Sequence, residues 1–316
     1  MILFLRYEGN RRGVFHIFSL ACFAVSLLII EVCVILPLIV LLIDYLFLSH
    51  GEIRKVAGNF LRLHLGFFIV LGADLMVRSY IIGWSFFSQR ALWALNFING
   101  THPLWRFFTV LKISALYARL LFFPYDLKIE YLFQPANSFL EPAVLFGLAL
   151  LLLLIIAFVK NVKRHPVLSF SIIWLFITML PVSNLFPQGN IFAERYLYIP
   201  SLGFCVGAGF IFWWLLKQNV KTEFLAWKRY VYVLFILLTI AFGRVTYERN
   251  KVWQSDLILW QETVCKSPGN FRAHVNLATA YYNLSRWDKA MEEISIALAI
   301  EPSSSDALFT SGSIYL

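Results

Sequence analysis

Residues 181–204, PVSNLFPQGNIFAERYLYIPSLGF, hold the densest group of side chains that could do chemistry. Glu194, Arg195, Tyr196 and Tyr198 place an acid, a base and two phenols close together, after prolines and a glycine that interrupt a helix. A guanidinium binds phosphate through its planar set of donors. A purely structural loop is the alternative. The pattern favours a functional site in which Arg195 binds phosphate or pyrophosphate and Glu194 orients it.

Two further sets of ionisable residues lie inside apolar stretches. Glu31 interrupts SLLIIEVCVILPLIVLLIDYLF, where it could face a polar cavity or simply be hydrated at the tip of a helical hairpin. Asp74 and Arg78 are four positions apart, which predicts an ion pair on one helix face. Arg78 could instead bind a lipid phosphate. Asp44 is expected to lie at the membrane interface.

The elements that must position these residues are membrane helices. Hydrophobic residues make up 60% of the 316 positions and charged residues only 14%, against about 45–50% and about 25% in soluble domains. The net charge of +9 comes from basic residues in short loops, which argues against nucleic-acid binding. Runs long enough to cross a bilayer are predicted at 13–30, 32–49, 63–82, 105–124, 142–159, 166–185, 198–216 and 230–247.

The run 105–124 differs from the others because it carries Arg106, Lys112 and Arg119. Burying each charge near mid-bilayer costs about 2.5–3.5 kcal/mol. We therefore expect an interfacial or re-entrant helix there and about seven crossings in total. This count leaves the basic loops in the cytoplasm, and residues 83–141 and the C-terminus outside it. The predicted fold is all-α, a polytopic transmembrane helix bundle.

The composition changes near residue 251, which divides the chain into a membrane domain, 1–250, and a region of helical repeats, 251–316. Residues 270–303 match one full 34-residue tetratricopeptide repeat (TPR), and a second begins at Ser305 and is truncated. The matching apolar and small residues are Leu277, Ala278, Tyr281, Ala290, Ile294 and Ala297. Because such repeats need neighbours to bury their apolar faces, we expect the chain to be a fragment. No spacing of Cys or His predicts a metal site or a disulfide framework.

Three segments together carry a family resemblance: SNLFPQGNIFAERYLYIPSLGF, ALYARLLFFPYDLKIEYLF and RNKVWQSDLILWQETVCKSPGN. With the TPR that follows, they resemble the transmembrane and TPR-containing O-mannosyltransferases and their bacterial relatives. SLLIIEVCVILPLIVLLIDYLF also resembles a family segment, although Ile30 stands where the family has Lys. The resemblance implies the C-terminal part of a GT-C type membrane domain followed by the first TPRs.

The resemblance also implies an activity, protein O-mannosylation or a related sugar transfer. Such glycosyltransferases pass a sugar from a polyprenyl-phosphate carrier to a protein acceptor on the non-cytoplasmic side. By position, Glu31 and Glu194 would be the catalytic or polarising carboxylates, and Arg195, Arg78 and Tyr198 would hold the lipid phosphate. No cofactor is expected beyond the lipid-linked sugar, which is the donor substrate. The expected partners are the bilayer, this lipid and a protein held by the TPRs, with no nucleic acid.

The chain departs from the family because the presumed catalytic Asp, in a first large extracytoplasmic loop, is missing. We therefore expect a C-terminal fragment that is inactive alone. Two alternatives are a non-catalytic membrane-anchored TPR scaffold and an O-antigen-ligase-like enzyme. The expected location is the bacterial inner membrane with periplasmic TPRs, or the endoplasmic reticulum with luminal TPRs in a eukaryote.

Overall fold

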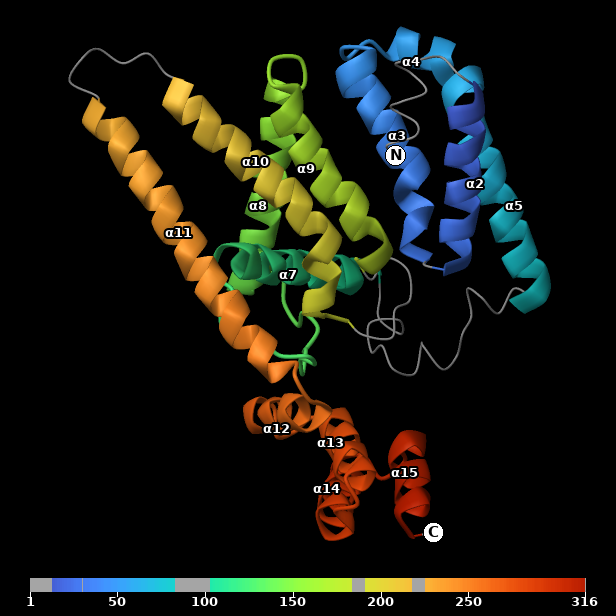
Figure 1. The fold of residues 1–316 in the computed structure, drawn as a ribbon, viewed down its shortest axis with the longest axis vertical. Coiled ribbons are helices and arrows are strands. Elements are labelled where there is room, and N and C mark those ends of the chain that lie inside the picture. Colours follow the sequence, from blue (N-terminus) through green and yellow to red (C-terminus); the bar gives the residue numbers. More distant parts are fainter. Residues whose placement is uncertain (1–12, 30, 83–102, 184–190, 218–224, 316) are drawn as a thin grey trace. The chain divides into compact units, whose positions relative to one another are not determined.

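The computed structural model describes residues 13–29, 31–82, 103–183, 191–217 and 225–315, and these residues form helices and connecting turns without a strand (Figure 1). The first helices are α2 (Gly13–Ile29), η1 (Glu31–Ile35), α3 (Leu36–Ile43), η2 (Asp44–Leu48), α4 (Ile53–Asn59), η3 (Phe60–His64), α5 (Leu65–Ile82) and α7 (Pro103–Phe122). The next are α8 (Pro142–Asn161), α9 (Pro166–Met179), η6 (Leu180–Val182), η7 (Glu194–Leu197) and α10 (Tyr198–Lys217). The last are α11 (Leu225–Val252), α12 (Asp256–Lys266), α13 (Phe271–Asn283), α14 (Trp287–Ile300) and α15 (Ser305–Tyr315). The predicted all-α class is confirmed.

The apolar helices coincide with the predicted crossings. Four are long enough to span a membrane, at Ile53–Ile81, Pro142–Asn161, Glu194–Lys217 and Lys228–Val252. Three shorter apolar helices follow the remaining predicted runs, at Gly13–Ile29, Val32–Leu48 and Pro166–Val182. Within the described residues, α7 is in neither set, although it is 20 residues long. The protein is a multi-pass membrane protein.

The chain divides into two compact units. The first contains residues 1–116, 135–191 and 196–218, and the second contains 117–134, 192–195 and 219–316. The second unit thus contains the repeat region, the candidate membrane helix α11 and two short segments, 117–134 and 192–195. The predicted domain boundary at residue 250 stays a prediction.

Close packing in the first unit depends on small residues. In α10, Gly203 and Gly207 face α9: an added Cβ at Gly203 would lie 2.9 Å from the Ser171 carbonyl oxygen, and one at Gly207 would lie 3.2 Å from the Ser171 Cβ. In α8, a Cβ at Gly147 would lie 2.1 Å from the carbonyl oxygen of Leu111 in α7. Helices in membranes gain stability from such close backbone approach. α7 therefore packs across the first turns of α8 (Figure 1).

The second unit contains the helices of the repeat region. α13 and α14 form an antiparallel hairpin whose buried contacts are Leu277, Tyr281 and Ala290 on one side and Val275, Ala278, Ile294 and Ala297 on the other. Asn270 caps α13, since its side chain accepts hydrogen bonds from the backbone of Arg272 and Ala273. The hairpin and the following α15 lie where the 34-residue spacing predicts two repeat units.

Candidate functional site

Glu194, at the start of η7, lies at the centre of a polar network in the second unit. Its Oε1 accepts hydrogen bonds from the backbone N–H of Lys128 and from the hydroxyl of Tyr131, the latter at 2.5 Å. Its Oε2 lies 3.7 Å from Nη2 of Arg249, near the end of α11. The carboxylate therefore joins three segments that are far apart in the sequence.

The same network continues into the first helix of the repeat region. Arg249 donates from Nη1 to Oε2 of Glu262 in α12 at 3.0 Å, and Lys266 donates to the other oxygen of Glu262 at 2.5 Å. Lys266 also donates to the Leu127 carbonyl at 2.9 Å, while Lys128 Nζ donates to the Lys266 carbonyl at 3.1 Å. Charge-assisted bonds of this kind are among the stronger polar contacts in proteins. They fix the turn around residue 128 against both α11 and α12.

Aromatic packing holds the backbone next to Glu194 in place. The ring of Phe192 lies 4.7 Å from that of Tyr117 and 4.8 Å from that of Tyr131, measured between centroids, and Phe133 stacks on it at 6.1 Å. Tyr117 also donates a hydrogen bond to the Ala193 carbonyl at 3.3 Å. Because Phe192 and Ala193 are buried, the backbone just before Glu194 is anchored.

Burial, together with the hydrogen bond to Glu194 and the charge of that carboxylate, raises the pKa of Tyr131 well above its ordinary value. Tyr131 therefore remains a neutral phenol at physiological pH and keeps donating to Glu194. The pair behaves as a fixed donor and acceptor.

The segment 194–198, which we call the rim, contains the other residues that the sequence predicts at this site. Their side chains have different surroundings from that of Glu194. Arg195 is exposed, and Tyr198, the first residue of α10, is 84% exposed. Glu194 and Arg195 thus face different surroundings although they are adjacent in the chain. Glu194 accepts hydrogen bonds from Lys128 and Tyr131 and is partly buried, whereas Arg195 is exposed.

The remaining predicted site residues belong to the first unit. Glu31 begins η1, in the turn between α2 and α3, and its side chain lies outside the described part of the structure. Arg78 donates from Nε to Oδ2 of Asp74 at 2.8 Å and from Nη2 to the Leu27 carbonyl at 2.6 Å. The predicted ion pair is confirmed, and Arg78 also ties α5 to the end of α2.

Asp44 is fully buried inside the first unit, and its expected place at the membrane interface stays a prediction. Its Oδ2 lies 2.7 Å from Nε2 of His64, and its Oδ1 accepts a hydrogen bond from Ser49 at 2.7 Å. A buried carboxylate needs such partners to offset the cost of desolvation. The π-helical turns η2 and η3 bring Asp44 and His64 together, which no local pattern predicts.

A polar groove of about 440 Å³ lies in the second unit. Its walls are formed by Glu130, by Phe271, Arg272, Val275, Asn276 and Thr279 of α13, and by Asp306, Phe309 and Thr310 of α15. Stacked helical repeats commonly present a concave surface for binding partners. Glu130 accepts a hydrogen bond from Asn270 at 3.5 Å, so the 117–134 segment contributes one wall of the groove.

Sequence reasoning missed most members of the network around Glu194. Lys128, Tyr131, Arg249, Glu262 and Lys266 were not singled out, yet all five lie in the two other segments that carry the family resemblance. That shared membership was the available signal. Among the described residues, no group of three or more His, Cys, Asp or Glu side chains could hold a metal ion.

Comparison with known proteins gives matches over about half of the chain. Protein O-mannosyl-transferase TMTC1 of Homo sapiens is 30% identical over 172 residues, 53% of this chain and 18% of that protein. Protein O-mannosyl-transferase Tmtc2 of Drosophila melanogaster is 31% identical over 149 residues, 46% of this chain and 15% of that protein. Over this part of its length the chain is similar to the protein O-mannosyl-transferases.

A third relative gives a longer match. Protein O-mannosyl-transferase F38B6.6 of Caenorhabditis elegans is 28% identical over 210 residues, 66% of this chain and 29% of that protein. The match therefore spans less than a third of the length of each O-mannosyl-transferase relative. No protein-family model and no solved structure matches the chain.

Proposed function

We propose that this chain acts in a membrane glycosyltransferase that transfers a sugar, by analogy with its relatives a mannose, from a polyprenyl-phosphate carrier to a protein hydroxyl. The transfer takes place on the non-cytoplasmic side, where the repeat region holds the acceptor.

One observation carries the proposal. Glu130 and Tyr131 are adjacent in a single segment, and Glu130 lines the groove of the repeat region while Tyr131 donates to Glu194 in the rim. Glu194 is followed directly by the exposed Arg195. A peptide in the groove would therefore lie on the same rigid network that orients the residue proposed to bind phosphate.

The chemistry assigns different tasks to the two rim residues. The acceptor oxygen forms a bond to C1 of the sugar, the bond from C1 to the phosphate oxygen breaks, and the lipid phosphate leaves with the electron pair. The proton of the acceptor hydroxyl passes to a carboxylate that acts as general base. Arg195 stabilises the charge on the departing phosphate. Glu194, whose oxygens already accept internal hydrogen bonds, holds the rim in place.

Arg78 and Tyr198 have supporting tasks in this proposal. Arg78 donates from one guanidinium nitrogen to Asp74 and from another to the Leu27 carbonyl, and in this proposal its planar group also contacts the lipid phosphate. Tyr198 offers a hydroxyl beside the rim.

The test is a transfer assay in membranes that contain the gene product carrying these residues, with a radiolabelled polyprenyl-phosphate mannose as donor. We expect Arg195→Gln to lower transfer at least tenfold with a raised KM for the donor, and Asn276→Ala with Glu130→Ala to raise the KM for the acceptor alone. Glu52→Gln, at an exposed ion pair with Lys55, is the matched control. Unchanged transfer in Arg195→Gln would remove phosphate binding from the proposal.

The scaffold alternative predicts a different result in the same membranes. If the intact protein captures a partner through the groove but transfers no sugar from the labelled donor, the proposed glycosyltransferase function is wrong.

A further inference from the structure

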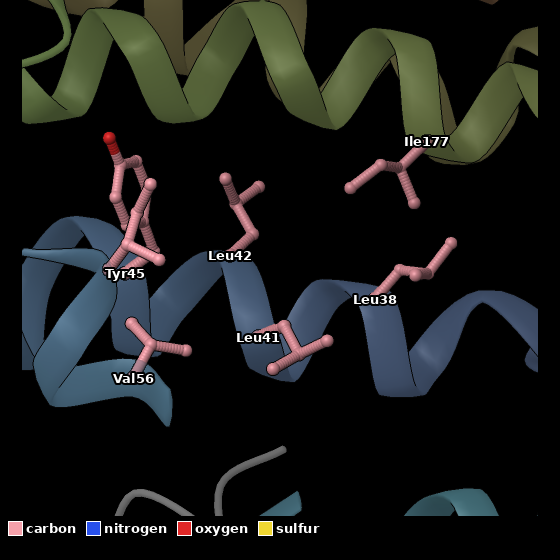
Figure 2. A pocket seen from close by; sticks show the side chains of 7 residues that line it. Leu38, Leu41, Leu42, Tyr45, Val56 and Ile177 are labelled. Carbon is pink, nitrogen blue, oxygen red and sulfur yellow. The ribbon is translucent and has the colours of Figure 1, made fainter. Parts of the chain in front are cut away.

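The first unit has a second hollow, an apolar groove of about 360 Å³ between α3 and α9 (Figure 2). Leu38, Leu41, Leu42 and Tyr45 line it from α3 and η2, Ile53 and Val56 from α4, and Ile177 from α9. In Figure 2 the side chains of Leu38 and Leu42 point toward α9, and Ile177 points back toward them. Apart from the Tyr45 hydroxyl, these side chains consist of hydrocarbon only.

Such a groove is poorly suited to ordered water, and its lining loses contacts when it is unfilled. Water needs two to four polar partners to occupy a cavity, and these walls offer almost none. An unfilled space would deprive the lining atoms of dispersion contacts. The groove lies along Val32–Leu48 and Pro166–Val182, two of the apolar helices that follow the predicted membrane crossings. The groove is therefore expected to face lipid, and a hydrocarbon chain is chemically suited to its apolar walls.

One end of the groove carries positive charge. Ile53 and Val56 of α4 line the wall, and Arg54 and Lys55 lie between them in the sequence with exposed side chains. Lys163, which follows α8, is also exposed and lies beside Gly51 at the start of the same turn. Glu52 pairs with Lys55 at 3.1 Å, but both side chains are more than half exposed, so the surface keeps a positive excess.

We propose that this groove binds one acyl chain of an anionic membrane phospholipid, with its phosphate held at Arg54, Lys55 and Lys163. A basic surface next to the bilayer attracts acidic headgroups, by about 1 kcal/mol or roughly fivefold per Lys or Arg. These loops are predicted to be cytoplasmic, whereas sugar transfer is proposed on the other side. The occupant is therefore a bilayer lipid and not the sugar donor, and the proposal does not depend on the glycosyltransferase function.

The test uses the purified protein in lipid nanodiscs that contain phosphatidylglycerol with a photoactivatable group in one acyl chain. Mass spectrometry after illumination should find crosslinks in the peptides that contain Leu38, Tyr45 and Ile177. Leu38→Trp should fill the groove and reduce these crosslinks at least fivefold. Leu152→Trp, at an exposed position of α8, is the matched control and should leave them unchanged.

Headgroup selection is tested separately with the same probe on phosphatidylcholine. We expect phosphatidylglycerol to crosslink more efficiently, and the double variant with Arg54→Gln and Lys55→Gln to lose most of that preference. Ile53→Trp, at a 73% exposed position, replaces Leu38→Trp if the latter does not fold. Equal crosslinking of both phospholipids, crosslinks that survive the filled groove, or stronger labelling by a photoactivatable polyprenyl phosphate would each overturn the proposal.

Discussion

Replacing Glu194 with alanine tests whether this carboxylate organises the second unit. The change removes the acceptor of the Tyr131 hydroxyl and one of the two acceptors of the Lys128 N–H, which also donates to the Tyr131 hydroxyl at 3.2 Å. A hydrogen bond to a charged group contributes about 1.5–3 kcal/mol. Because the Glu194 side chain is only 23% exposed, water replaces these partners incompletely. We expect the free energy that opens the Lys128 amide to fall by about 1.5–3 kcal/mol, which means roughly 10- to 150-fold faster hydrogen exchange.

The assay is hydrogen–deuterium exchange of the intact chain in nanodiscs, followed on peptides that cover residues 123–134. Glu194→Gln keeps a neutral acceptor and should give a smaller increase. Tyr131→Phe removes the second acceptor of the Lys128 N–H and should also give a smaller increase. Glu52→Ala removes an exposed carboxylate of the first unit, worth about 0–1 kcal/mol, and serves as the control. Exchange at Lys128 within twofold of the unmodified protein, in a folded Glu194→Ala variant, would refute the reasoning.

Three further changes test the packing and charges of the first unit. Gly147→Leu should cost about 1–3 kcal/mol of stability through overpacking. The measurement is the fraction of monodisperse protein in detergent, which should fall. Gly209→Leu is the control, because Gly209 faces open space and the fraction should not change. Asp44→Ala strands a buried partner and should cost about 3–5 kcal/mol, measured as a lower melting temperature. The backbone N–H of Asn137, and then Lys112, lower the pKa of Glu141 below 4.5. The unmodified protein should therefore be more stable than Glu141→Gln at neutral pH. This difference in stability should vanish as the pH falls through the lowered pKa.

The rim around Glu194 shows where sequence reasoning succeeds and where it ends. The cluster of an acid, a base and two phenols at 194–198 predicts the location of the site. The family resemblance indicates three segments that contribute to it. Neither tells which residues meet, because Lys128, Tyr131 and Arg249 reach Glu194 from segments distant in the chain. Glu194 and Arg195 also have the same local sequence context, yet one is engaged internally and the other is exposed.

The sequence by itself determined the apolar helices, the exceptional character of the charged α7, and the helical hairpin that begins after Asn270. These features depend on length, composition and a short repeat period, which act within a few turns of helix. Three contacts were decided only by the tertiary structure. Asp44 is buried against His64, Glu130 lines the groove of the repeat region, and Gly147 packs against the backbone of Leu111. Such contacts arise because packing brings together surfaces that are remote in sequence, and their partners leave no local periodicity.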